Sequence, residues 1–370
     1  MHPAIVAIGV FLSVQLAIFI VRLLYRGPIL RKLDVEMAFS VAQAKEGEEV
    51  QLATTLTNAK WLPLPWVAVK FHVSRHLLFA DTTAMQVSDF YYRQDLYHVL
   101  MHQRVTRRFE FVCGKRGFYT IDGLDITGWD ILMDNKSAQF HESDAKLTVY
   151  PATLEPTEAE RLITMAYGQM QSFVPMFADP FSFRGIRAYA PNDPMKAVNF
   201  KASAKGAYSP GQELMVNLWE FTNNRRVILM LNLEKHNLWH SDAQDEYSIK
   251  LAATFARRLA ADNVPMRFVT NGVQVPEGRG FAYFEGVLEV LAHVDLKQEY
   301  DSVFSDALAQ VEEDAEYILI STYHGADWLA AYDNLLARGV RVVWLLPCNQ
   351  GIKLDEGDMR EKVGERALYI

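Results

Sequence analysis

The stretch Arg226-Val-Ile-Leu-Met-Leu-Asn-Leu233 decides the fold expected for the second half of the chain. From Val227 to Leu233 it forms an almost unbroken apolar run, which is typical of a strand buried on both faces of a sheet. Such a strand requires helices on both sides of the sheet to cover it. We therefore expect strands and helices to alternate through the residues that follow.

The sequence after this strand has the expected alternation. We predict, in chain order, a helix at 245–262, a strand at 266–269, helices at 284–294 and 302–313, a strand at 317–321, a helix at 326–338 and a strand at 340–346. The pattern predicts a parallel, doubly wound α/β domain over 226–350. A charged tail is expected over 351–370, although its last residues, 367–370, could dock.

The first half of the body has the pattern of β structure. Apolar and polar residues alternate over 50–56 and 67–73, and glycine-rich turn signals separate later apolar runs. Short strands with this spacing predict an antiparallel β-sandwich over 34–150. Residues 151–225 are expected to connect the two domains.

An apolar, uncharged stretch opens the chain. Ala4–Val21 contains only Ser13 and Gln15 as polar side chains, and as a helix it would span about 27 Å. Its charged flank comes after the apolar run: Arg22, Arg26, Arg31 and Lys32. A cleavable signal peptide has its positive charges before the run, so we favour a retained transmembrane anchor over 1–32. The positive-inside rule then predicts a single-pass protein of the bacterial inner membrane with its body in the cytoplasm.

Charge and cysteine content exclude several classes of protein. The 370 residues carry a net charge of −8, and the part after the basic flank is more acidic still, which disfavours nucleic acid as a partner. Two cysteines, Cys113 and Cys348, are too few for a disulfide scaffold. Glycine-rich phosphate loops, serine-hydrolase motifs and zinc-protease motifs are absent from the sequence. We therefore predict no catalytic residues and no cofactor.

The end of the first strand of the α/β region is the place where a metal site would be sought. Asn232, Glu234 and His236 follow the apolar run at alternate positions, and three such side chains could hold a divalent cation. They could equally cap the strand and the following turn. We favour the capping role and expect no metal site.

The segment 179–205 has the most unusual composition in the chain. It combines basic, acidic and aromatic side chains in a stretch too polar for a core strand and too aromatic for a disordered linker. Two roles are open for it, a structural clasp held by its own bonds and a partner-binding surface rich in arginine and aromatics. The candidate residues are Arg184, Arg187, Tyr189, Asp193 and Lys201.

This segment resembles the signature of the bacterial domain-of-unknown-function 58 family. The family pattern Phe-Arg-Gly-x-Arg-x-Tyr-x-x-Gly-Asp is matched by 183–193 except for Asn192. A following Asp-Trp-Lys-Ala-Ser-Ala-Arg is matched at 199–205 except for Asn199, Phe200 and Lys205. Further matches are Leu62–Trp66, Arg116–Tyr119 and Val149–Pro151.

The resemblance implies a von Willebrand factor A-like domain at the C-terminus and a MoxR-type AAA+ ATPase as partner. Magnesium-binding domains of that type have Asp-x-Ser-x-Ser where this chain has Asn232, Glu234 and His236, so tight metal binding is not expected. We expect a membrane-tethered, non-enzymatic adaptor that works with the ATPase and its client protein in complex assembly or maturation. The alternatives are a metal-dependent adhesion module and a hydrolase with a site near Asp193, Asn199 and Lys201.

Overall fold

The computed structural model divides the chain into two compact units. Unit 1 comprises Met1–Thr153 with Glu285–Lys297, and unit 2 comprises Leu154–Phe284 with Gln298–Ile370. The structure describes residues 3–27, 29–79, 85–87, 90–171, 183–189, 195, 198–205, 214–219, 226–234, 242–271, 273–296, 312, 314–348 and 363–370. Each unit is described by itself below.

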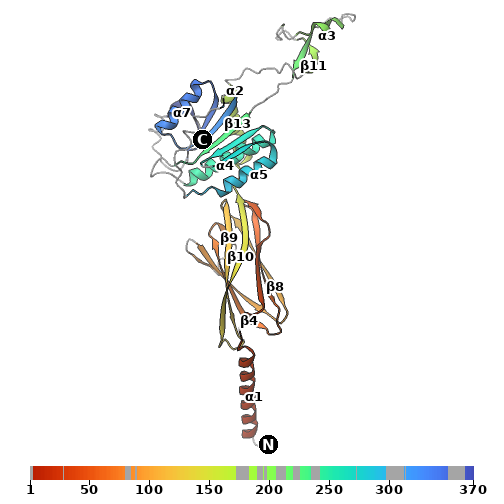
Figure 1. Ribbon diagram of the computed structural model, residues 1–370, viewed down its shortest axis with the longest axis vertical. Helices are drawn as coiled ribbons and strands as arrows, with labels where there is room; N and C mark the ends of the chain where they lie inside the picture. Colours follow the sequence, from red (N-terminus) through yellow and green to blue (C-terminus); the bar gives the residue numbers. More distant parts are fainter. Residues whose placement is uncertain are drawn as a thin grey trace. The chain divides into compact units, whose positions relative to one another are not determined.

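Unit 1 is a β-sandwich preceded by a helix, α1 (Pro3–Leu24). One sheet has the order β1-β3-β8-β5 and the other β2-β10-β9-β4-β7-β6. Nearly all pairings are antiparallel, and β9 and β10 lie side by side over most of their length (Figure 1). The strands are β1 (Leu33–Phe39), β2 (Gln43–Lys45), β3 (Glu49–Asn58), β4 (Leu64–Ser74), β5 (Leu77–Phe79), β6 (Met85–Val87), β7 (Phe90–Val99), β8 (Arg104–Cys113), β9 (Gly117–Trp129) and β10 (Lys136–Tyr150).

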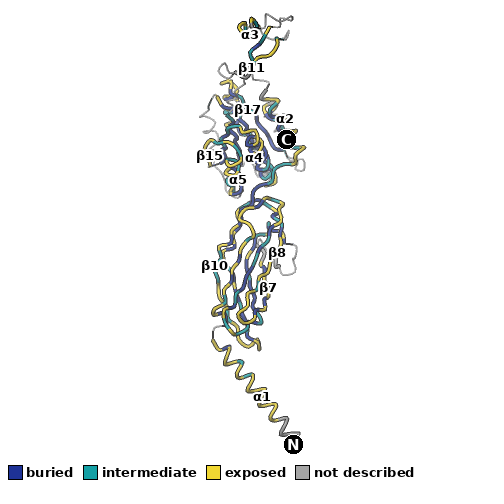
Figure 2. Tube along the Cα trace, turned by 90° about the vertical axis from the view of Figure 1, so that its right-hand side faces the viewer, coloured by how far each residue is buried: buried dark blue, intermediate teal, exposed yellow. Residues whose placement is uncertain are grey.

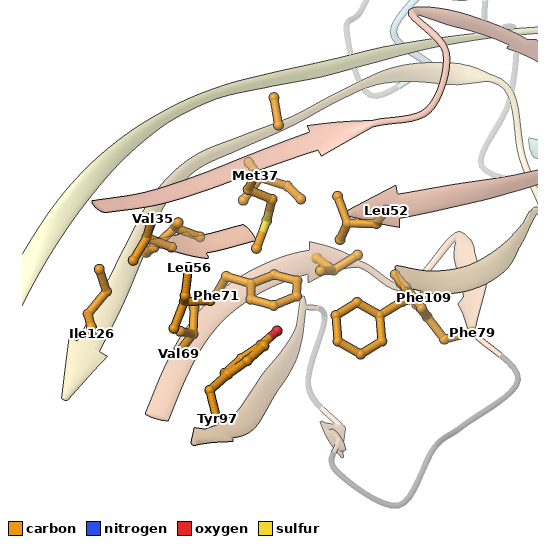
Figure 3. Close-up of a cluster of buried hydrophobic side chains, with 14 of the residues drawn as sticks. Val35, Met37, Leu52, Leu56, Val69, Phe71, Phe79, Tyr97, Phe109 and Ile126 are labelled. Atoms are coloured by element: carbon orange, nitrogen blue, oxygen red, sulfur yellow. The ribbon is translucent and has the colours of Figure 1, made fainter. Parts of the chain in front are cut away.

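The sandwich core forms because alternate residues of these strands point between the two sheets. Leu52 and Leu56 from β3 are fully buried and lie close to Phe71 of β4 and Tyr97 of β7 (Figure 3). The apolar alternation in 50–56 and 67–73 therefore marks the inward faces of β3 and β4, as expected from the sequence. The antiparallel sandwich predicted for this region is present.

A buried arginine joins the sandwich to the C-terminal half of α5 (Gly280–His293), which belongs to unit 1 from Glu285 onward. Arg116 donates to the carbonyl oxygen of Leu291 at 2.7 Å and to that of Val294 at 3.0 Å. The Tyr150 hydroxyl donates to a Glu289 carboxylate oxygen at 2.9 Å. Arg116 thus satisfies carbonyls at a helix C-terminus that have no partner within the helix.

Unit 2 is built around a six-stranded sheet of order β15-β14-β13-β16-β17-β18. All its pairings are parallel except that of β15 with β14. Helix α4 packs against β13, and α2 against β17 (Figure 1). Its elements are α2 (Pro156–Gln171), β11 (Phe183–Ala188), α3 (Phe200–Lys205), β12 (Met215–Trp219), β13 (Arg226–Asn232), α4 (Asp242–Ala261), β14 (Met266–Thr270), β15 (Val273–Gly278), the start of α5, β16 (Ala315–Ser321), α7 (Ala326–Ala337), β17 (Arg341–Leu346), η2 (Gly364–Arg366) and β18 (Ala367–Tyr369).

The predicted fold class is wrong for this chain. It combined a membrane anchor, a β-sandwich and an α/β domain of von Willebrand factor A type. Strands account for 45% of the structure and helices for 32%, so the molecule is mostly β. The long strands of the sandwich contribute much of this strand content. The sheet of unit 2 is mixed and not fully parallel, because β15 runs antiparallel to β14. The apolar runs located β13, β14, β16 and β17 correctly, but they carried no signal for β15.

The last residues of the chain dock onto the sheet, which is the alternative that the sequence left open for 367–370. Ala367–Tyr369 forms β18, which pairs with β17, and the Cys348 amide donates to the carbonyl oxygen of Ile370. The helix predicted at 302–313 falls almost entirely outside the described residues.

The predicted membrane anchor is also wrong. In the part of the chain that the structure describes, no helix is long and apolar enough to cross a membrane. Most of the described side chains of α1 are exposed, as Figure 2 shows. The predicted inner-membrane location and cytoplasmic orientation were inferred from the anchor, so these predictions are wrong as well.

The last turn of α1 instead contacts the sandwich of unit 1. Arg22 forms an ion pair with Asp134 at 2.8 Å, and Val21 packs against the sandwich core. Tyr25, directly after the helix, is buried and donates to the carbonyl oxygen of Pro63 at 2.6 Å. The basic residue that was expected to flank a membrane thus pairs with a carboxylate of the chain itself.

Candidate functional site

A two-stranded sheet and a short helix form the candidate site, which contains the segment singled out in the sequence. Strand β11 pairs antiparallel with β12, and an isolated bridge joins Val198 to Val216. Val198 and Val216 are both buried, so they provide an apolar contact beneath the strands. Residues far apart in the segment are therefore held together as one small element, which we call the hairpin–helix element (183–189, 198–205 and 214–219).

Asn199 and Ser203 hold the helix of this element against its strands. The Asn199 Oδ1 accepts from the Ala202 amide at 2.9 Å, which makes Asn199 the N-cap of α3. Its Nδ2 donates to Asn217 Oδ1 on β12 at 2.7 Å. The Ser203 hydroxyl donates to the Asn199 carbonyl oxygen at 2.8 Å and accepts from the Met215 amide at 2.9 Å. Two residues of the sequence signature therefore fix the fold of the element.

The sequence did not assign these structural roles to Asn199 and Ser203. An asparagine directly before a short helical run is the usual signal for an N-cap, and it was present at Asn199. The bond from Asn199 to Asn217 could not be read from the sequence, because the two residues meet only when β12 pairs with β11.

The predicted site residues are distributed over the same element. Arg187 is exposed on β11, and its Nη1 donates to the carbonyl oxygen of Ala188 at 3.0 Å. Tyr189 is half-buried, and its amide donates to the carbonyl oxygen of Leu214 at 2.6 Å. Lys201 is exposed on α3. The side chain of Arg184 and the whole of Asp193 lie outside the described residues.

Apolar side chains are exposed on this element and its flanks beside the basic ones. Phe200, the first residue of α3, is 67% exposed, and Met195 is 60% exposed. Ile186 and Leu214 are exposed as well. Aromatic, methionine and arginine side chains are enriched in protein–protein interfaces. Burying a phenylalanine normally stabilises a fold, so an exposed one is unusual. We call Ile186, Met195, Phe200 and Leu214 the exposed apolar set.

The residues at the end of β13 that were considered as metal ligands belong to a hydrogen-bond network. Asn232 is buried and donates to Ser321 Oγ at 3.3 Å, while its Oδ1 accepts from Asn271 Nδ2 at 3.2 Å and from the Glu234 amide at 3.0 Å. Asn271 in turn accepts from the Leu233 amide at 2.7 Å. His236 lies outside the described residues.

This network ties together the carboxyl ends of three parallel strands. Ser321 ends β16, and its carbonyl oxygen accepts from Trp344 Nε1 of β17 at 3.0 Å. Both polar atoms of the Asn232 amide are thus committed to hydrogen bonds within the fold. Within the described ranges, no group of three or more His, Cys, Asp or Glu is arranged to hold a metal ion.

Comparison with known proteins yields structural similarities only. No family model and no curated protein matches the chain. The CARDB domain of the PF1109 protein from Pyrococcus furiosus is 10% identical, covers 32% of this chain and 90% of its own, and has a TM-score of 0.22. A non-cellulosomal cohesin from Archaeoglobus fulgidus is 14% identical over 35% of this chain and 97% of its own, with a TM-score of 0.23. The bacterial hydrophobin BslA is 14% identical over 33% and 98%, also with a TM-score of 0.23.

The CARDB and cohesin structures are β-sandwich domains and not von Willebrand factor A-type domains. The TM-scores are too low for any of these likenesses to indicate what this chain binds or does. The resemblance to the domain-of-unknown-function 58 family stays a prediction.

Proposed function

We propose that the protein is a non-enzymatic adaptor that docks a MoxR-type AAA+ ATPase or its client through the hairpin–helix element. The resemblance of the signature segment to the domain-of-unknown-function 58 family suggests a MoxR-type ATPase as the class of partner. The exposed apolar set, with Arg187 and Lys201 on the same element, is the proposed binding surface. The observation that carries the proposal is the exposure of Phe200 on a helix whose backbone is fixed by Asn199 and Ser203.

The arrangement of Phe200 fits a hot spot better than a core residue. A phenylalanine held at the start of a capped helix loses little conformational freedom on binding, so its burial by a partner is not offset by a large entropy cost. Arg187 adds a planar donor that recognises carboxylates. A MoxR-type partner with an apolar pocket bordered by acidic residues would complement both side chains.

Phe200→Ala tests this proposal directly. Binding of the purified chain to a purified MoxR-type ATPase from the same organism would be measured by biolayer interferometry. We expect at least about tenfold weaker binding, because truncating a hot-spot aromatic costs about 2 kcal/mol or more. Arg187→Ala should weaken binding further.

Phe281→Ala is the matched control. Phe281 lies in the first turn of α5 and is 58% exposed, so it resembles Phe200 in residue type, element and exposure. This control should bind as the unaltered chain does. The proposal is wrong if the Phe200→Ala and Arg187→Ala variants, with unchanged circular dichroism spectra, also retain full affinity.

A further inference from the structure

A cavity in unit 2 lies outside the hairpin–helix element and outside the Asn232 network. Its volume is about 340 Å³, within the range of small-molecule sites. It is lined by residues of the first two turns of α2 and α4, by Pro347 and Cys348 after β17, and by Ile370 after β18. Ligands of open sheets with parallel strands usually bind at this carboxyl edge.

Two opposite charges line this cavity without pairing to each other. Glu158 and Arg161 are three residues apart on α2, so they lie on the same side of the helix. Glu158 accepts the Tyr247 hydroxyl at 2.7 Å through Oε1. The exposed side chain of Arg161 forms no ion pair and no hydrogen bond with another residue in the described part of the chain. The cavity therefore offers an anion site at Arg161 and a cation site at the remaining oxygen of Glu158.

Gln244 gives a second, independent sign that the cavity accepts a ligand. This residue of the first turn of α4 lines the cavity and is only 4% exposed. Its side-chain amide forms no hydrogen bond with another described residue. A ligand with a donor and an acceptor would complete the hydrogen bonds of this amide.

Tyr247 keeps Glu158 in place for such a ligand. Burial, and then the hydrogen bond to Glu158, raises the pKa of the Tyr247 phenol, so the hydroxyl stays protonated and remains a donor. The Glu158 carboxylate is thereby oriented as an acceptor at the edge of the cavity. A phosphate ligand is disfavoured because Glu158 lines the cavity and Asp242 and Asp245 lie in the first turn of α4.

We infer that this cavity binds a free α-amino acid with a hydrogen-bonding side chain. The ligand carboxylate pairs with the Arg161 guanidinium, its ammonium group with the Glu158 carboxylate, and its side chain with the Gln244 amide. A zwitterion satisfies both lining charges at once, which neither a simple anion nor a simple cation can do. The inference does not depend on the proposed adaptor function.

Cys348 provides a way to detect this ligand without an activity assay. Its half-buried thiol lines the cavity, whereas Cys113 is completely buried in unit 1 and serves as an internal reference. Alkylation of Cys348 by iodoacetamide would be followed by mass spectrometry with L-glutamine and, one at a time, the other standard L-amino acids. We expect at least one to slow alkylation of Cys348 and to bind in calorimetry.

Ligand analogues and variants then locate the binding. The N-acetyl and the carboxamide derivatives of the best amino acid each lack one charge and should bind at least about tenfold more weakly. Arg161→Gln should have the same effect. Arg338→Gln changes the exposed C-cap arginine of α7, which lies outside the cavity, and should have none. The inference is overturned if no amino acid protects Cys348, if Arg161→Gln binds as well as the unaltered chain, or if either derivative binds as well as the amino acid.

Discussion

At the scale of single residues, several polar side chains of this protein are fully committed to the fold. Arg93 is buried in the sandwich, pairs with Asp95 at 2.9 Å and lies over the ring of Phe109 at 4.0 Å. Asn232 has a similar structural role in unit 2, at a position where the sequence left a metal ligand open as the less favoured alternative. A polar residue at a strand end is thus weak evidence for a ligand site until its bonds are known.

The buried thiol of Cys113 makes the stability of the sandwich depend on alkaline pH. Burial, with a smaller effect of the nearby Glu48 carboxylate, raises the pKa of Cys113 from 9.0 to about 11. Above pH 9 the unfolded chain loses this proton while the folded chain keeps it, so the contribution to stability is lost as the pH rises towards 11. We expect a loss on the order of 2–3 kcal/mol from this group.

Urea unfolding of unit 1 at several pH values from about 8 to about 11 checks this expectation. Cys113→Ala should be less stable at every pH because it leaves a small cavity, but its stability should decline less steeply over this range. Equal slopes for the variant and the unaltered chain would show that the thiol does not titrate in this way.

At the scale of elements, the hairpin–helix element shows how a very short helix can hold its place. A helix of six residues is not stable alone, because nucleation costs more than so few hydrogen bonds return. Here α3 is capped by Asn199 and fastened to β12 by Asn217 and Ser203. Specific side-chain bonds therefore replace length as the source of stability.

Asn199→Ala should loosen this element. Loss of an N-cap costs about 1 kcal/mol, so the Ala202 amide should exchange its hydrogen about five times faster, and the Met215 amide should follow. Hydrogen exchange followed by NMR gives both rates. Asn199→Asp retains an acceptor oxygen and should keep the Ala202 amide protected, although it loses the bond to Asn217. Unchanged exchange in Asn199→Ala would contradict the capping role.

At the scale of the whole molecule, unit 1 is assembled from two separate parts of the sequence. Glu285–Lys297 belongs to the same compact unit as the sandwich, although residues of unit 2 separate it from Thr153 in sequence. Arg116 and Tyr150 supply the bonds to this part. A segment that lies far away in the sequence therefore completes the compact unit of the sandwich.

A fragment of residues 29–153 tests this organisation. In the full chain, Arg116→Ala should destabilise the sandwich by about 1–3 kcal/mol, because two helix-end carbonyls lose their donor. In the fragment, the same substitution should have little effect, since the carbonyls of Leu291 and Val294 are absent. Chemical denaturation of the four proteins gives the two differences, and equal differences would contradict a role for these bonds.

Local patterns in the sequence were sufficient for much of the secondary structure. Alternation in 50–56 and 67–73 predicts β3 and β4, and the apolar run after Arg226 predicts β13, because the period of apolar residues reflects which side of a strand is buried. The same patterns failed for β15, whose residues are mostly exposed at the edge of the sheet, and for β18 they left docking only as an alternative to a tail. Edge strands bury few apolar side chains, so the alternation of apolar and polar residues in their sequence is weak.

The sequence by itself determined the inward faces of the sandwich, the central strands of unit 2 and the segment that forms the candidate site. The tertiary structure alone decided that Asn199 meets Asn217, that Asn232 meets Asn271 and Ser321, and that Glu158, Arg161 and Gln244 line one cavity. The physical reason is that burial periodicity is a property of neighbouring residues, whereas these polar contacts join residues from different elements. Only strand pairing and helix packing bring such residues within hydrogen-bonding distance.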